Sequence, residues 1–221
     1  MKLLFNAIIK FVLGFVFIGL FLFWPAGTIN YPNGWLFIGL LFVPVLIIGI
    51  ILFIKDKELL RKRLNHKEKE KTQKGVVLFS LFIFISGFII STLDFRYSWS
   101  NVNNYLVIIA SVLFLIGYVL YAIVMKQNAY LSRTIEVQEN QKVIDNGLYG
   151  IVRHPMYFAT LLMFIPIPLI LGSFWGLIPF SLYLVVIVIR IINEEKVLTL
   201  NLCGYSEYKK KVKYRLIYFI W

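Results

Sequence analysis

Long apolar blocks are the feature that most limits what this chain can fold into. Four of them approach or exceed the roughly 20 residues that a helix needs to cross about 30 Å of hydrocarbon. They cover residues 3–24, 35–54, 76–93 and 105–125. The blocks are too continuous for the alternation of a membrane barrel, and lipid requires backbone groups to be satisfied within each segment. The sequence therefore predicts an all-α, polytopic integral membrane protein with four spanning helices.

The distribution of positive charge indicates a topology. The net charge is +12, and Lys and Arg concentrate in residues 55–74, in residues 126–153 and after Arg190. The loops between the other apolar blocks carry only Arg96. By the positive-inside rule we expect both termini and the basic segments on the cytoplasmic side of the membrane. The chain is rich in Phe, Ile, Lys, Asn and Tyr, which suggests an AT-rich microbial genome, so we expect the cell membrane of a microbe. Attraction to lipid headgroups accounts for this charge, so we expect membrane lipids and no nucleic acid as partners.

The C-terminal apolar stretch, residues 157–190, is interrupted by prolines and glycines. One straight helix is not expected there. The pattern predicts a broken helical hairpin that turns near residues 172–176, with arms of about 15 residues that are short for a full span. The tail after residue 190 mixes charges with aromatic residues, which is typical of a segment at the membrane interface.

Composition also excludes several classes of site. Cys203 is the only cysteine, and His66 and His154 stand in unrelated contexts, so we expect no disulfide and no metal. No G-x-G-x-x-G segment or alternating strand–helix pattern occurs, which excludes a soluble Rossmann-type enzyme.

We divide the chain into N-terminal transmembrane helices, residues 1–125, and a C-terminal region, residues 126–221, that form one structural unit.

Two polar clusters could carry chemistry. The first cluster surrounds His154 and Pro155. Proline suits the first turn of a helix, so we expect a helix to begin at Pro155, with His154 directly before it. The N–H groups and the dipole of that helix end would attract an anion. The second cluster places Arg190 and Glu194 on one helix face, while Glu195 points about 100° away. Contacts to lipid headgroups and an ordinary helix-end ion pair are the alternative interpretations.

These residues carry a resemblance to a known family. The segments Arg153-His154-Pro155-Met156-Tyr157, Arg190-Ile191-Ile192-Asn193-Glu194-Glu195 and Gly204-Tyr205-Ser206-Glu207-Tyr208 resemble the isoprenylcysteine carboxyl methyltransferase family. The resemblance covers roughly residues 125–221, and phospholipid methyltransferases share parts of the pattern. It implies an integral membrane methyltransferase that binds S-adenosylmethionine in a cytoplasmic pocket between its last helices and their connecting segments.

The resemblance also implies roles for individual residues. The positions that match the family's cofactor-binding residues are Gln141, Lys142, Val143, Ile144, Tyr149, His154, Pro155, Met156, Tyr157 and Glu194. By the same resemblance Arg190 is the catalytic and substrate-binding residue, which meets the carboxylate of a lipophilic acceptor that enters from the bilayer. A carboxylate has no proton to lose, so the protein must mainly align the two reactants.

Three other functions fit parts of the pattern. N-methylation of an aminophospholipid would need a base to remove a proton from the amine, and Glu195 and His154 are the candidates. A reductase of the sterol-reductase type would bind NADPH instead. A non-catalytic membrane protein, such as a transporter, usually places ionisable residues in mid-bilayer, whereas the four long blocks contain almost none.

Overall fold

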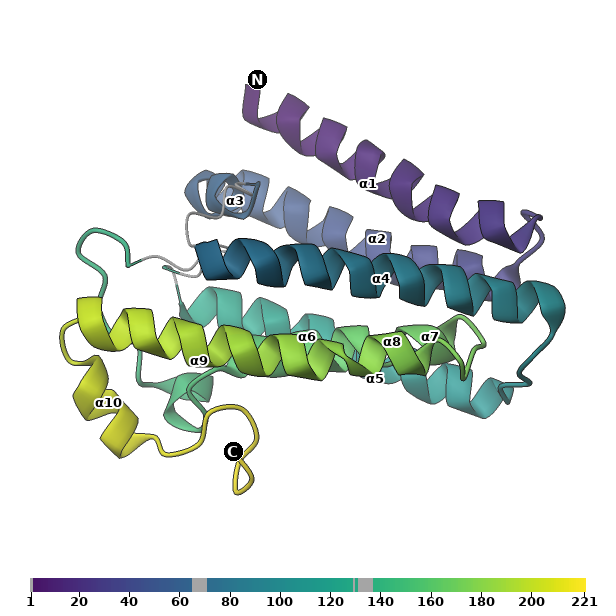
Figure 1. Ribbon diagram of the computed structural model, residues 1–221. Coiled ribbons are helices and arrows are strands. Elements are labelled where there is room, and N and C mark those ends of the chain that lie inside the picture. Colours follow the sequence, from purple (N-terminus) through teal and green to yellow (C-terminus); the bar gives the residue numbers. More distant parts are fainter. Residues whose placement is uncertain (1, 65–70, 129, 131–136) are drawn as a thin grey trace.

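The computed structural model describes residues 2–64, 71–128, 130 and 137–221, and in these residues it is helical and contains no strand. The elements are α1 (Lys2–Ala26), α2 (Pro32–Lys55), α3 (Lys57–Leu64), α4 (Lys71–Tyr97), α5 (Asn104–Gln127), the 3₁₀ helix η1 (Gly147–Gly150), α6 (Pro155–Phe164), α7 (Ile167–Ile170), α8 (Leu177–Ser181), α9 (Tyr183–Asn201) and α10 (Tyr205–Lys211). Figure 1 shows the long helices side by side as one bundle. The predicted all-α fold is confirmed.

Five described segments are long and apolar enough to cross a membrane. Four of them fall on α1, α2, α4 and α5 and confirm the four predicted spans. The fifth is Leu177–Asn201, so the expectation of two short arms is wrong for the returning arm of the hairpin. Helix α9 continues past Arg190 to Asn201, and the carboxylates of Glu194 and Glu195 within it accept hydrogen bonds from other side chains. The outgoing arm, Pro155–Ile170, is short as predicted.

The two ends of the bundle differ in charge. In Figure 1, α3, α10 and the C-terminal tail lie at the left, which we call the basic end because it holds Lys55, Lys126 and the lysines of α10. Lys10 also belongs there, since its ammonium group donates to the carbonyl of Leu64. The basic segments expected on one side thus share one end of the bundle, although residues 65–70, 129 and 131–136 lie outside the described residues.

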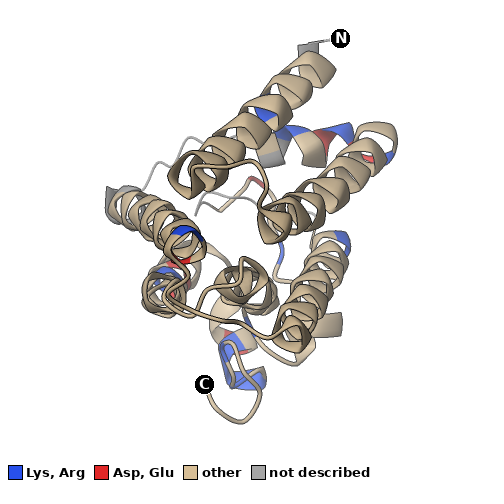
Figure 2. Ribbon diagram, turned by 90° about the vertical axis from the view of Figure 1, so that its right-hand side faces the viewer, with Lys and Arg blue, Asp and Glu red and all other residues tan. Residues whose placement is uncertain are grey.

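The other end, which we call the opposite end, carries the turns after α1, α4 and α7 (Figure 1). Figure 2 looks along the helices from this side, and most of the ribbon is tan because the spans contain few charged residues. Large apolar side chains on α1 and α2, such as Phe5, Leu13 and Ile47, are exposed on the protein surface. Lipid contact gives such side chains the apolar surroundings that water would not.

Close packing of the central helices fixes where the hairpin lies. A Cβ at Gly117 of α5 would come within 2.6 Å of Met163 and 3.0 Å of the carbonyl oxygen of Ala159, so α6 approaches the backbone of α5 directly. A Cβ at Gly87 of α4 would likewise come within 2.4 Å of the ring of Phe180. Small residues at helix interfaces are a usual means of close packing in membranes. The hairpin is thereby held against α4 and α5.

Polar residues tie the hairpin turn to the end of α4. The buried carboxylate of Asp94 accepts hydrogen bonds from the backbone N–H and hydroxyl of Ser100, at 2.6 and 2.5 Å, and from the hydroxyl of Ser173, at 2.5 Å. The hydroxyl of Tyr31 donates to the carbonyl of Leu171 at 2.6 Å. Together these bonds fasten the predicted turn near residues 172–176, which forms with Gly172 at φ 80°.

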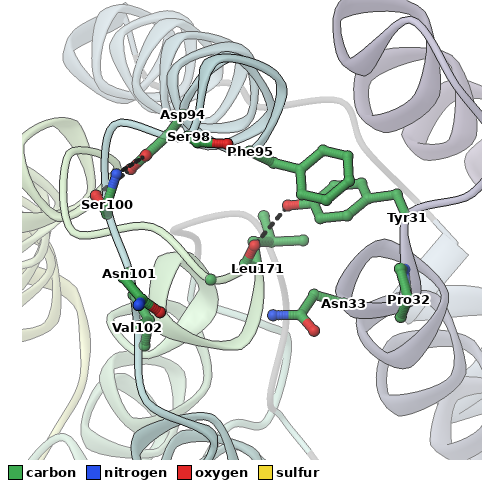
Figure 3. A pocket seen from close by; sticks show the side chains of 11 residues that line it. Tyr31, Pro32, Asn33, Asp94, Phe95, Ser98, Ser100, Asn101, Val102 and Leu171 are labelled. Carbon is green, nitrogen blue, oxygen red and sulfur yellow. Dashed lines mark hydrogen bonds between the residues drawn. The ribbon is translucent and has the colours of Figure 1, made fainter.

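A cavity of about 350 Å³ opens beside these contacts (Figure 3). Its lining includes Asn33, Asn101 and Ser98. Figure 3 shows the side chains of Asn33 and Asn101 on different sides of the cavity. None of the residues implied in methyl transfer lines this cavity.

Removing the hydroxyl of Ser173 should destabilise the fold. Ser173→Ala leaves Asp94 with one donor fewer and leaves the N–H of Gly176, which donates to that hydroxyl at 3.0 Å, without its acceptor. We expect a loss of about 1–3 kcal/mol in the free energy of unfolding. Ser181→Ala is the matched control, because the exposed hydroxyl of Ser181 bonds only within its own turn, to Ile178. Equal unfolding midpoints of the two variants in detergent would contradict the prediction.

Candidate functional site

The start of α6 forms the first wall of the candidate site. As predicted, α6 begins at Pro155 and His154 is its N-cap residue. The carbonyl of His154 accepts from the N–H groups of Tyr157 and Phe158, at 3.1 and 3.3 Å, which closes the first helical turn. The ring of His154 is buried and its Nε2 lies 3.3 Å from the carboxylate of Glu195. The imidazole therefore faces a protein carboxylate on α9 through that nitrogen.

One hydroxyl joins the two clusters that the sequence singled out. The hydroxyl of Tyr157 donates to the carboxylate of Glu194 at 2.6 Å. It accepts from Nε of Arg190 at 3.4 Å. Arg190 and Glu194 thus share a face of α9, as their spacing predicts, and that face is turned toward α6. The residue implied in substrate binding and two residues implied in cofactor binding form one hydrogen-bonded unit.

Glu195 points to another side and is the centre of an ion-pair cluster. Its carboxylate accepts from Nε of Arg153 at 2.7 Å and from Nε of Arg215 at 3.0 Å, in addition to its contact with His154. Glu195 is 4% exposed. Three side chains of the protein already occupy this carboxylate. Glu195, one of the two bases considered for an amine acceptor, is therefore poorly suited to that role.

The C-terminal tail lies against the start of α6 and is hydrogen-bonded to it. The backbone N–H groups of Arg153 and His154 donate to the carbonyls of Tyr214 and Arg215, at 2.9 and 2.8 Å. The guanidinium of Arg153 adds bonds to the carbonyls of Val212 and Lys213, at 2.7 and 2.9 Å. Apart from the family resemblance, the only role predicted for Arg153 and the tail was contact with the membrane interface. The structure makes them part of the framework of the site.

The segment before η1 lies between α5 and α10. Val143 packs against the buried cluster of α10, whereas Ile144 packs against the cluster of Val124 and Met125 on α5. The two neighbouring side chains thus contact different helices. The side-chain oxygen of Gln141 accepts from the N–H of Gln138 at 2.8 Å, and Lys142 is exposed. The four residues implied in cofactor binding therefore have different surroundings, and only two of them pack into a hydrophobic cluster.

Helix α10 holds this segment in place. The hydroxyl of Tyr208 donates to the carbonyl of Tyr149 at 2.7 Å, and burial raises the pKa of Tyr208, so the hydroxyl stays protonated. The hydroxyl of Tyr149 accepts from the side-chain amide of Asn128 at 3.0 Å. At the surface, Lys211 donates to Asp145 at 2.7 Å, and this hydrogen bond lowers the pKa of the carboxyl. The cofactor-binding residue implied at Tyr149 is buried between α5 and α10.

Two buried polar atoms at the basic end have no hydrogen-bond partner within the described part of the chain, namely the hydroxyl of Tyr205 and Nδ2 of Asn193. Buried polar atoms are nearly always paired, so an orphaned atom calls for an explanation such as a bound ligand. S-adenosylmethionine carries an ammonium group, a carboxylate and ribose hydroxyls. The acidic Glu194 and the two orphaned donors fit a ligand of that polarity, and we regard the cofactor implied by the resemblance as compatible with the site.

Sequence reasoning did not identify Arg215 or Tyr205 as residues of the site. Tyr205 falls in a segment that carries the family resemblance, but nothing in its spacing distinguishes it from Tyr208. Arg215 looks like one more basic residue of the tail. Only the folding of the tail onto the start of α6 brings its guanidinium to Glu195, 20 residues earlier in the chain.

Loss of the Glu195 carboxylate should unfold the basic end. Glu195→Ala leaves the 6% exposed Arg153 without its buried counter-charge, and breaking such a pair from one side costs about 3–5 kcal/mol. Glu207→Ala is a control that also removes one glutamate, from an exposed position, and should change the free energy of unfolding by less than about 0.5 kcal/mol. Thermal unfolding in detergent measures both, and a Glu195→Ala midpoint as high as that of Glu207→Ala would refute the cluster's structural role.

Part of the chain is similar to a known protein family. Residues 105–202 match the family model of the phospholipid methyltransferases, and a comparison with curated proteins finds no significant match. The matched residues run from the start of α5 to the end of α9. They include the start of α6, Arg190, Glu194 and Glu195. This family lies in the membrane methyltransferase superfamily that also includes the isoprenylcysteine carboxyl methyltransferases. Residues 105–202 are therefore similar to the phospholipid methyltransferase family, and they lie within a polytopic helical membrane protein.

Proposed function

We propose that this protein is an S-adenosylmethionine-dependent methyltransferase that acts on a lipophilic acceptor at the basic end of the bundle. The observation that carries the proposal is the hydroxyl of Tyr157, which bonds to both Glu194 and Arg190. Glu194 would receive the cofactor's hydroxyls or ammonium, and Arg190 would hold the acceptor. A single tyrosine thus lies between the two ligands that methyl transfer must bring together.

The acceptor group that best suits these residues is a carboxylate. Arg190 presents a guanidinium, which can hold a carboxylate in a fork. S-adenosylmethionine would supply the methyl group, whose bond to the sulfonium sulfur would break as its bond to a carboxylate oxygen forms, and that oxygen has no proton to lose. The residues considered as bases face other partners, since Glu195 binds two arginines and His154 faces Glu195. Catalysis would then rest on alignment and on exclusion of water from the contact between the ligands.

The family match supports a second candidate, N-methylation of an aminophospholipid. A protonated amine must lose a proton before it can attack a methyl group. Glu194 is the better placed carboxylate for this step, because it is partly exposed and accepts a hydrogen bond from Tyr157. In this reading Glu194 would serve the acceptor as well as the cofactor.

The basic end is the proposed cytoplasmic side of the membrane. Its lysines favour that orientation by the positive-inside rule. A charged cofactor is then available from the cytosol, while the hydrocarbon tail of the acceptor stays in the bilayer. Arg190 lies within the last candidate span, Leu177–Asn201, at a depth that a lipid-anchored group could reach.

Arg190 and Glu194, the two charged residues bonded to Tyr157, should have separable effects on cofactor binding and on methyl transfer. We expect the detergent-purified protein to bind S-adenosylmethionine, Glu194→Ala to abolish that binding, and Arg190→Ala to preserve binding while it abolishes transfer. Equilibrium binding of radiolabelled cofactor and a transfer assay with lipid extract measure these effects. Glu207→Ala, which is exposed on α10, serves as the charge-matched control. Binding of NADPH without binding of S-adenosylmethionine would contradict the proposed function.

The stability of the labelled product to base distinguishes the two acceptors. Transfer to a prenylated cysteine carboxylate gives a methyl ester, so we expect the label to be released as volatile methanol by mild alkali. Label that survives alkali and migrates with phosphatidylethanolamine derivatives would instead support N-methylation. Wild-type protein and Arg190→Ala should be compared with both acceptors, because a residue that holds a carboxylate should matter less for an amine.

A further inference from the structure

The hydroxyl of Tyr205 is an unexplained feature of the basic end. Tyr205 is 3% exposed, yet its hydroxyl has no hydrogen-bond partner among the described residues. Leaving a buried hydroxyl without a partner destabilises a fold, and phenylalanine would fill the same space without that penalty. The packing of α10 therefore does not account for a tyrosine at this position.

The surroundings of Tyr205 connect it to the candidate site. Its side chain packs in one hydrophobic cluster with Leu202, Val212 and Val143, the last of which is implied in cofactor binding. Burial raises the pKa of Tyr205, and the negative charges of Glu195 and Glu194 raise it further. The hydroxyl therefore keeps its proton and can donate a hydrogen bond to an acceptor.

Tyr208 shows how a structural tyrosine on the same helix differs. It lies three residues later on α10 and is 5% exposed, and its ring centroid is 5.7 Å from that of Tyr205. Its hydroxyl donates to the carbonyl of Tyr149 at 2.7 Å. Both tyrosines are buried, but the hydroxyl of Tyr208 bonds to the backbone of Tyr149, whereas that of Tyr205 has no partner among the described residues.

We propose that the hydroxyl of Tyr205 is a ligand-binding group, which donates a hydrogen bond to an oxygen of bound S-adenosylmethionine. This proposal rests on the proposed function and adds to it a cofactor contact on α10, outside the residues that the resemblance implies. Ligand binding would pair the hydroxyl, so its contribution would appear in affinity for the cofactor and not in stability of the free protein.

Removal of each hydroxyl in turn tests the assignment. Tyr205→Phe and Tyr208→Phe are made in the full chain, and each is measured for S-adenosylmethionine affinity by equilibrium binding and for thermal unfolding without ligand. For Tyr205→Phe we expect the dissociation constant to rise about five- to tenfold, since one hydrogen bond is lost, with an unchanged or higher unfolding midpoint. For Tyr208→Phe we expect a midpoint lower by about 2–4 °C, because its hydroxyl bonds to the carbonyl of Tyr149.

The possible outcomes separate this proposal from the one on which it depends. If wild-type protein binds the cofactor and Tyr205→Phe binds it equally well, the hydroxyl is not a cofactor contact and the proposal is overturned while the proposed function stands. If Tyr205→Phe lowers the unfolding midpoint as Tyr208→Phe does, the hydroxyl has a structural partner and the proposal is likewise overturned. If wild-type protein does not bind S-adenosylmethionine at all, both proposals fail together.

Discussion

The buried carboxylate of Glu195 is the interaction on which the basic end depends. Burial of a charge is unfavourable unless counter-charges and hydrogen bonds compensate for it. Glu195 satisfies this requirement with Arg153 and Arg215, which come from the segment before α6 and from the C-terminal tail. Since these partners are far apart in sequence, the cluster can form only when α9, the start of α6 and the tail have all come together. It thereby fixes the walls between which a ligand would bind.

The same cluster separates the roles of two adjacent glutamates. Glu195 is occupied by arginines, whereas Glu194 turns toward Tyr157 and, through its hydroxyl, toward Arg190. This division suits a reaction that depends on alignment, because one carboxylate holds the framework and the other can contact ligands. Both functions fit on one turn of α9, since neighbouring residues of a helix point about 100° apart.

The membrane imposes a second division, between the two ends of the bundle. Charged residues gather at the basic end, while the opposite end is held by hydrogen bonds of Asp94 and Tyr31 to the hairpin turn. Between them, contact of α6 with Gly117 of α5 sets the position of the hairpin. The turn and the close packing bring the returning arm back to the basic end, where Tyr157 of the outgoing arm contacts α9.

The sequence by itself determined the membrane fold, four of the spans, the hairpin turn and the start of α6 at Pro155, because hydrocarbon length and proline geometry act locally. It also placed Arg190 and Glu194 on one face through helical periodicity. It could not give the length of the last span, since Arg190 and the two glutamates after it look like the polar end of an apolar arm, whereas in the structure they lie within α9. Tertiary structure alone decided that Arg215 pairs with Glu195 and that Tyr205, unlike Tyr208, has no described partner, because these contacts join segments whose separation in sequence carries no periodic signal.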